Sequence, residues 1–179
     1  GQVKNLKIFV SPNYFLNEEN INIKKLVFSE ANFFFTKDNL DFINKLLNKE
    51  FSKKKIFVKK SKAFFNDKSG DTIFIYSLKN LKYFKNIKDN SKFLFTEGNI
   101  FKVPIKFQWI KKIDSKSTIS NFKAKNLDID FTNKGKFSGN EFIYENNLNI
   151  LSNNLKTKYI FDKNEKTISV ISEKSLIKN

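Results

Sequence analysis

The sequence predicts a mainly β protein, built as a curved, largely antiparallel β-meander sheet with one short amphipathic helix. Apolar and polar residues alternate along most of the chain, turn residues recur between the alternating runs, and only one segment has the spacing of an amphipathic helix. The chain has 179 residues, of which 40% are hydrophobic and 29% are charged. It is long and apolar enough to form a hydrophobic core, and its composition is not that of an intrinsically disordered protein. We expect a single β-rich domain over residues 1–179.

The first third of the chain predicts strands and the one helix. Strands are expected over residues 3–10, 21–28 and 31–35, with a bulge near Lys24 because the apolar face switches there. Residues 38–51 then carry apolar side chains at intervals of three and four residues. This spacing predicts a helix that covers one face of the sheet.

The middle of the chain predicts further strands. Residues 55–65 form one strand or two short ones, and residues 66–71 predict a hairpin turn. Residues 72–78 carry apolar side chains on both faces, so we expect this strand to be covered on both sides. Residues 100–110 alternate strictly but contain Pro104, which places that strand at an edge or a bulge.

The last third has the most regular pattern. Alternating apolar residues between Phe122 and Val170 predict a meander of short strands. Clusters of Asn, Asp, Lys and Gly predict the turns between them. These turns are expected at residues 133–135, 146–147 and 162–165, and an earlier one at residues 98–99.

The residue types exclude the common catalytic sites. The chain has no His, no Cys and no Arg, so neither a Ser-His or Cys-His nucleophile pair nor a tetrahedral zinc site can be built. Asp128 and Asp130 could form an acid–base pair, but they alternate with apolar residues, which indicates a solvent-facing side of a strand. We therefore expect no enzyme, no cofactor and no metal.

The net charge of +16 has two interpretations. Lysine and asparagine are common in proteins from AT-rich genomes, so codon usage can produce this charge without a functional cause. Alternatively, the charge attracts an anionic partner such as lipid headgroups or nucleic acid. Lysines mixed with aromatic residues, as in residues 79–88, are typical of single-strand binders, but the missing arginines argue against readout of base edges. No specific nucleic acid is expected.

The 22 phenylalanines are the most informative feature. Several strands carry apolar residues on both faces. Either a second layer covers the additional face, or that face lines an open apolar groove. The groove candidates are the following apolar residues of these strands: Phe28, Phe33, Phe35, Ile73, Ile75, Phe101, Val103, Ile105, Phe107, Leu127, Ile129 and Phe131.

The succession of segments 26–33, 39–43, 56–61, 98–105 and 122–131 resembles the periplasmic part of AsmA-like proteins. The likeness covers roughly residues 1–131. It implies an elongated, curved sheet with an apolar concave face that conducts phospholipid between the inner and outer membranes. Alternating apolar side chains would solvate the acyl chains, and lysines at the rim would attract anionic headgroups weakly.

The resemblance also implies a location. No stretch of the chain approaches the roughly 20 apolar residues of a membrane-spanning helix. We expect a fragment of a longer envelope protein, in the periplasm and anchored to the inner membrane by a segment outside this chain. The leading hypothesis is a non-catalytic fragment that binds or conducts phospholipid and supports outer-membrane biogenesis. The alternatives are a nucleic-acid-binding basic β-domain and a purely structural or adhesive β-domain.

Overall fold

The computed structural model describes residues 1–11, 23–36, 54–151, 153–162 and 168–176. Within these residues the chain forms strands and one 3-10 turn, Lys125–Leu127, so the predicted mainly β, largely antiparallel fold is confirmed. The predicted helix at 38–51 lies outside the described residues. The strands are β1 Gln2–Val10, β2 Ile23–Phe35, β3 Lys55–Asn66, β4 Thr72–Asn86, β5 Ser91–Ile100, β6 Val103–Lys112, β7 Ser117–Ala124, β8 Ile129–Ser138, β9 Glu141–Ile150, β10 Asn153–Asp162 and β11 Ile168–Leu176.

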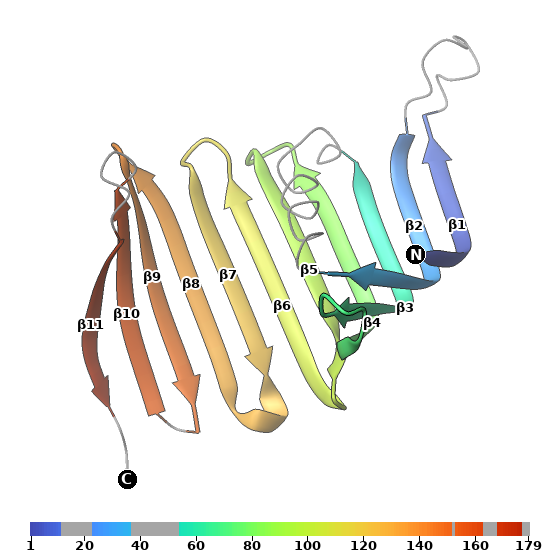
Figure 1. The fold of residues 1–179 in the computed structure, drawn as a ribbon. Helices are drawn as coiled ribbons and strands as arrows, with labels where there is room; N and C mark the ends of the chain where they lie inside the picture. The colour runs from blue at the N-terminus through green and yellow to red at the C-terminus, as the bar shows by residue number, and fades with distance from the viewer. Residues whose placement is uncertain (12–22, 37–53, 152, 163–167, 177–179) are drawn as a thin grey trace. The chain divides into compact units, whose positions relative to one another are not determined.

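The chain divides into two compact units. The first contains Gly1–Lys85 and Leu94–Lys102, and the second contains Asn86–Phe93 and Val103–Asn179. Strands follow the chain order in each unit, from β1 to β5 in the first and from β6 to β11 in the second (Figure 1). The pair β2–β3 is parallel, whereas β1–β2, β3–β4 and the pairs from β6 to β11 are antiparallel.

Several turns lie elsewhere than the composition predicts. The hairpin at residues 66–71 is confirmed, and Asp67 Oδ1 accepts hydrogen bonds from the amides of Ser69 and Asp71 at 2.9 Å. A further hydrogen bond, from the Ser69 hydroxyl, is the main cause that lowers the pKa of Asp67. The predicted turn at residues 98–99 is wrong, because the chain turns at Phe101 and Lys102, whose φ angles are 49° and 65°.

The turns expected at residues 133–135 and 146–147 are also wrong, because both segments lie inside strands. Gly135 is a strand residue with a packing role: a Cβ there would lie 2.6 Å from the ring of Tyr144, directly opposite on β9. A glycine covered by a cross-strand aromatic ring is a known device of β-sheets. The actual turns contain Gly139 and Leu151, both with positive φ.

A bend crosses the strands of the first unit at a line of polar pairs, where the apolar side of each strand shifts by one residue. The pairs are Lys4-Asn5 in β1, Ser29-Glu30 in β2, Lys59-Lys60 in β3 and Lys79-Asn80 in β4. Glu30 and Lys60 have φ angles of 54° and 47°. This left-handed backbone turns the strands, and Figure 1 shows β2 turning sharply part-way along. We call this feature the bend line.

The core of the first unit lies on one face of β2 to β4. The buried apolar residues there are Leu26, Ala31, Ile56, Val58, Ala63, Tyr76, Leu78 and Tyr83. The hydroxyl of Tyr76 hydrogen-bonds the Thr96 hydroxyl of β5 at 2.9 Å. Burial raises the pKa of Tyr76, although this hydrogen bond opposes the shift. By contrast, β1 is exposed at every residue.

Candidate functional site

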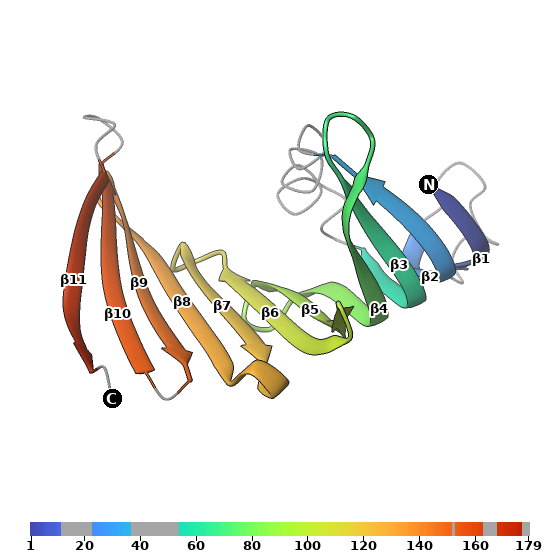
Figure 2. The ribbon, with the colours of Figure 1, turned by 60° about the horizontal axis from the view of Figure 1, so that its bottom comes forward.

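The register of the second unit sorts its side chains onto two faces. Residues directly opposite one another in an antiparallel pair point to the same face, and successive residues point to opposite faces. Strands β6 to β10 lie side by side in chain order in both views (Figures 1 and 2). The face that carries Phe107 and its cross-strand partners is here called the apolar face, and the other the lysine face.

Two continuous apolar rows cross the strands on the apolar face. One row follows direct pairs across all five strands: Phe107, Phe122, Phe131, Leu148 and Leu155. The neighbouring row contains Ala124, Ile129 and Ile150, with Ile105 on the same side of β6. Because strands lie about 4.8 Å apart, the five-strand row extends roughly 19 Å.

A second apolar region lies toward the other end of these strands. Phe137, Phe142 and Phe161 are paired across β8, β9 and β10. Their rings are close, with centroids 4.8 Å apart for Phe137 and Phe142 and 6.5 Å apart for Phe142 and Phe161. Tyr144 and Tyr159 form the adjacent pair. The aromatic content of this unit is therefore concentrated on one face.

The apolar face is not a filled core. Ile105 and Ala124 are buried, but Leu155 is 41% exposed and Ile150 is 38% exposed, and most of the other row members are half-buried. Within the part of this unit that the structure describes, no second layer of strands or helices lies over the sheet. The described residues therefore leave part of the hydrocarbon surface of this face exposed.

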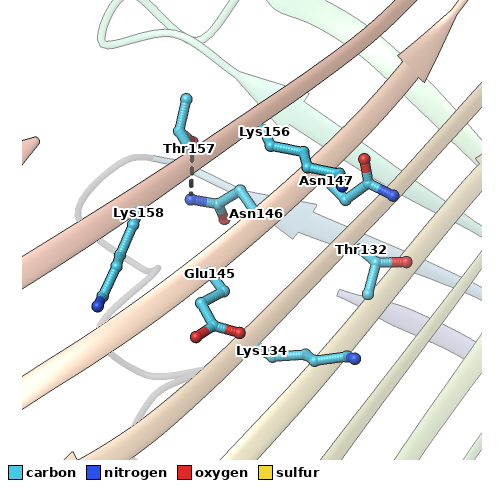
Figure 3. Close-up of a pocket in the computed structure, with 8 residues that line it drawn as sticks. All are labelled: Thr132, Lys134, Glu145, Asn146, Asn147, Lys156, Thr157 and Lys158. Atoms are coloured by element: carbon cyan, nitrogen blue, oxygen red, sulfur yellow. Dashed lines mark hydrogen bonds between the residues drawn. The ribbon is translucent and has the colours of Figure 1, made fainter. Parts of the chain in front are cut away.

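A polar row lies between the two apolar regions of this face. Asn133 on β8, Asn146 on β9 and Thr157 on β10 are direct cross-strand partners. Asn133 Nδ2 donates to Asn146 Oδ1 at 2.6 Å. Asn146 Nδ2 in turn donates to Thr157 Oγ1 at 3.2 Å, as Figure 3 shows. We call these three residues the amide row.

The lysine face has the opposite character. Of the lysines in β6 to β10, only Lys111 lies on the apolar face. The others outnumber the acidic residues that share their face, Asp130, Glu141, Glu145 and Asp162. They are Lys106, Lys112, Lys123, Lys134, Lys136, Lys156 and Lys158.

A shallow depression of about 480 Å³ lies on the lysine face. Lys134, Glu145 and Lys158 line it from three neighbouring strands, together with Thr132, Asn146, Asn147, Lys156 and Thr157 (Figure 3). A second depression of about 240 Å³ is lined partly by Ile119 and Ile143, so this face also has a small apolar area. Most residues that line the two depressions belong to the lysine face, but Asn146 and Thr157 of the apolar face also line the first, and Thr118 and Gly135 also line the second.

The first unit carries an aromatic ladder beside its core. Phe35, Phe65 and Phe74 are direct partners on β2, β3 and β4. Their rings stack with centroids 5.4 Å and 4.3 Å apart. Phe33 stacks on Phe35 at 6.4 Å and meets Phe28 edge-on at 6.2 Å across the bend line. These five rings form one half-buried cluster.

The structure brings together only part of the predicted groove. In the first unit Phe28, Phe33 and Phe35 share the aromatic cluster. In the second unit five candidates share the apolar face: Val103, Ile105, Phe107, Ile129 and Phe131.

Four groove candidates lie elsewhere. Ile73 and Ile75 point to the opposite side of β4 from the core and are 62% and 38% exposed. Phe101 is 75% exposed in the turn between β5 and β6. Leu127 belongs to the 3-10 turn and not to a strand, because Asp128 adopts a left-handed conformation with φ 50°. Backbone with positive φ, at Phe101 and at Asp128, ends the alternation of apolar and polar residues in both turns.

Sequence reasoning missed the residues that complete the rows. Phe122, Leu148 and Leu155 each lie in an alternating run, but alternation alone does not tell which runs share a face. The amide row was missed for a different reason. The composition at Asn146 predicts a turn, and a chain of amides that hydrogen-bond across strands has no local signal in the sequence.

Searches for relatives add no family assignment. No protein-family model matches the chain, and no curated protein sequence matches it. Among the residues that the structure describes, no helix has the length and hydropathy needed to cross a bilayer. The functional argument therefore depends on the two faces of the sheet.

Proposed function

We propose that the chain is a non-catalytic fragment of an envelope protein that binds phospholipid acyl chains on the apolar face of its sheet. The observation that carries this proposal is the half-exposed row from Phe107 to Leu155, which presents hydrocarbon across five strands without a covering layer in the described unit. A contiguous exposed apolar surface is typical of an interaction site.

The energetics favour a long, flexible apolar ligand. Each methylene removed from water contributes about 0.8 kcal/mol, so an acyl chain that follows the row gains several kcal/mol before the cost of immobilisation. The rows of aromatic and aliphatic side chains themselves make no directional contact, which suits an acyl chain of no fixed conformation. The first unit's aromatic cluster offers a second, smaller surface of the same kind.

The segregation of charge supports the same function. Lysines on the far face remain hydrated while the apolar face is covered by lipid. On the resemblance to AsmA-like proteins, we place the full-length protein in the periplasm, anchored to the inner membrane by a segment outside this chain. It would there bind or conduct phospholipid in support of outer-membrane biogenesis.

The proposal is tested by lipid extraction from the purified chain. We expect phospholipid to co-purify and to be identified by mass spectrometry after expression in a Gram-negative host. The delipidated chain should then bind phospholipid saturably at a stoichiometry near one or a few molecules. A chain that contains no lipid and binds none in titration would overturn the proposal.

A second candidate function is sequence-independent binding of a polyanion such as single-stranded nucleic acid. It is favoured by the depression that Lys134, Lys156 and Lys158 line on the lysine face. Phosphate contacts release counterions, so such binding must weaken steeply with salt. No binding of single-stranded DNA at low ionic strength would eliminate this candidate.

A further inference from the structure

The amide row is an unusual feature of an otherwise apolar surface. On either side of it, two residues along each strand, lie apolar pairs: Phe131, Leu148 and Leu155 on one side, and Tyr144 and Tyr159 on the other. This spacing places the row about 6.6 Å from each neighbouring row. A ligand that spans the apolar rows on both sides of the amide row therefore also covers the amides.

The row has hydrogen-bonding capacity beyond its internal bonds. Each side-chain amide carries two N–H donors. Asn133 and Asn146 each use one of them within the row, at 2.6 Å and 3.2 Å. Among the described residues, these two bonds are the side-chain hydrogen bonds that the three residues make. The second N–H of each amide and the hydroxyl hydrogen of Thr157 can therefore be donated to a ligand.

Covering these donors with hydrocarbon alone would be unfavourable. A polar group taken from water without a new partner loses free energy, whereas an acceptor on the ligand restores the hydrogen bond. The ligand that fits both features has long apolar chains and neutral oxygen acceptors where the chains end. Ester carbonyl groups of an acyl lipid have this arrangement.

We propose that the amide row binds the ester carbonyl oxygens of an acyl lipid whose chains lie along the neighbouring apolar rows. This inference rests on the proposed lipid-binding function and deepens it, since it identifies ester-linked lipids as the ligand class. By strand register all lysines of β6 to β10 except Lys111 lie on the opposite face, although Asn146 and Thr157 also line the depression that Lys134, Lys156 and Lys158 border. The neutral side-chain amides recognise the ester carbonyl groups at the headgroup end of the acyl chains.

The decisive experiment compares two lipids that differ only in the carbonyl groups. A diacyl phosphatidylcholine and its dialkyl ether analogue have the same headgroup and can be chosen with the same chain length. We expect the wild-type chain to bind the ester lipid roughly two- to tenfold more tightly for each hydrogen bond made. The measurement on the wild-type chain needs no variant and so cannot be confused with misfolding.

Variants then assign the preference to the row. The double variant Asn133→Leu/Asn146→Leu replaces amides with apolar side chains of similar size, so we expect it to retain the ether lipid and to lose the ester preference. The matched control acts on the pair on the lysine face, where Thr132 Oγ1 donates to Asn121 Oδ1 at 3.1 Å. The variant Asn121→Leu/Thr132→Val should keep the wild-type ratio.

The outcomes separate this inference from the proposed function. If neither lipid binds the wild-type chain, the lipid-binding function itself is wrong. If both bind with the same affinity, lipid binding stands and the role of the amide row is refuted. The role of the amide row would also be refuted if the control variant lowered the ratio of ester-lipid to ether-lipid affinity as much as Asn133→Leu/Asn146→Leu does. Such a result would attribute the effect to the stability of the sheet.

Discussion

The hydroxyl of Ser61 on β3 accepts a hydrogen bond from the backbone N–H of Ala31 on β2 at 3.0 Å, and it donates to the carbonyl of Lys59 at 2.8 Å. This contact lies on the bend line, where the parallel ladder is interrupted between Ser29 opposite Lys59 and Asn32 opposite Lys62. Ala31 is fully buried. The serine therefore supplies the partner that the bent backbone no longer offers.

The first prediction follows from this contact. In Ser61→Ala the buried Ala31 N–H loses its partner, and we expect the free energy of unfolding to fall by about 1–3 kcal/mol. Urea denaturation followed by circular dichroism measures the change. The control Ser77→Ala, at an exposed position of the adjacent strand, should be nearly neutral. Equal stability of the two variants would contradict the role of Ser61.

The second prediction concerns Gly98 inside β5. A Cβ at this position would lie 2.2 Å from the Ser77 carbonyl oxygen and 2.6 Å from the ring of Tyr76. Backbone cannot yield as a flexible side chain does, so Gly98→Ala should cost about 1–3 kcal/mol or more through overpacking. Thermal unfolding measures it. Asn99→Ala, the exposed neighbour, is the control and should leave the melting temperature almost unchanged.

The third prediction concerns pH and Tyr76. Burial raises the folded-state pKa of this phenol above its ordinary value of 10.0. The unfolded chain therefore loses this proton first as the pH rises, so the contribution to stability is fully present below about pH 10 and decreases above it. We expect Tyr76→Phe to reduce the slope of stability against pH between pH 10 and 11, measured by urea denaturation. An unchanged slope would show that the phenol titrates normally.

Tyr76→Phe should also destabilise the chain at neutral pH. It leaves the hydroxyl of Thr96, which is 7% exposed, without its 2.9 Å partner. We expect a loss of about 1 kcal/mol. The double variant Tyr76→Phe/Thr96→Val removes both polar groups and should recover part of this loss, which distinguishes an unsatisfied hydroxyl from lost packing.

The fourth prediction tests which face holds lipid. Ile150 and Leu155 are already partly exposed, so Ile150→Lys/Leu155→Lys should fold while placing charge on the apolar rows. We expect phospholipid affinity to fall at least tenfold, measured with a fluorescent lipid. Asn149→Lys adds charge on the lysine face of the same strand and should bind lipid as the wild type does.

The fifth prediction separates lipid from polyanion binding. Replacing Lys134, Lys156 and Lys158 by Gln removes charge from the depression on the lysine face. Lipid affinity of the apolar face should be the same in this variant as in the wild type. It should also stay constant when the salt concentration is raised about tenfold, from roughly 50 to roughly 500 mM, because apolar contacts are not screened by ions. Any binding of single-stranded DNA should weaken and its salt dependence should decrease. Loss of lipid affinity would place the headgroup on the lysine face.

Much of the fold could be predicted because alternation is a local property. The runs around Leu26, Val58 and Ile129 predict strands whatever they pair with, and the hairpin at residues 66–71 has a strong local signal. The turns at residues 98–99, 133–135 and 146–147 could not be predicted, because Gly and Asn also serve inside strands. Gly98 and Gly135 are required by close neighbours, and Asn146 hydrogen-bonds the amide of Asn133 and the hydroxyl of Thr157 across the strands.

The apolar face could be predicted only in part, because the sequence does not show which strands pair or in which register. Phe107 and Phe131 lie in recognisable strands, but their common row depends on the pairing of Phe107 with Phe122 and of Phe122 with Phe131. A shift of register by one residue would move every side chain of a strand to the other face. Phe101 and Leu127 lie outside the apolar face because residues with positive φ, Phe101 and Lys102 in one case and Asp128 in the other, end the alternating runs.

The sequence by itself determined a β protein without the side chains of common catalysis, because residue types and a period of two need no partner strand to be read. The tertiary structure decided which apolar runs share a face, where β2 to β4 bend, and that the amides of Asn133 and Asn146 meet. All three features depend on the register of strand pairing. That register is set by hydrogen bonds between residues that are distant in the sequence.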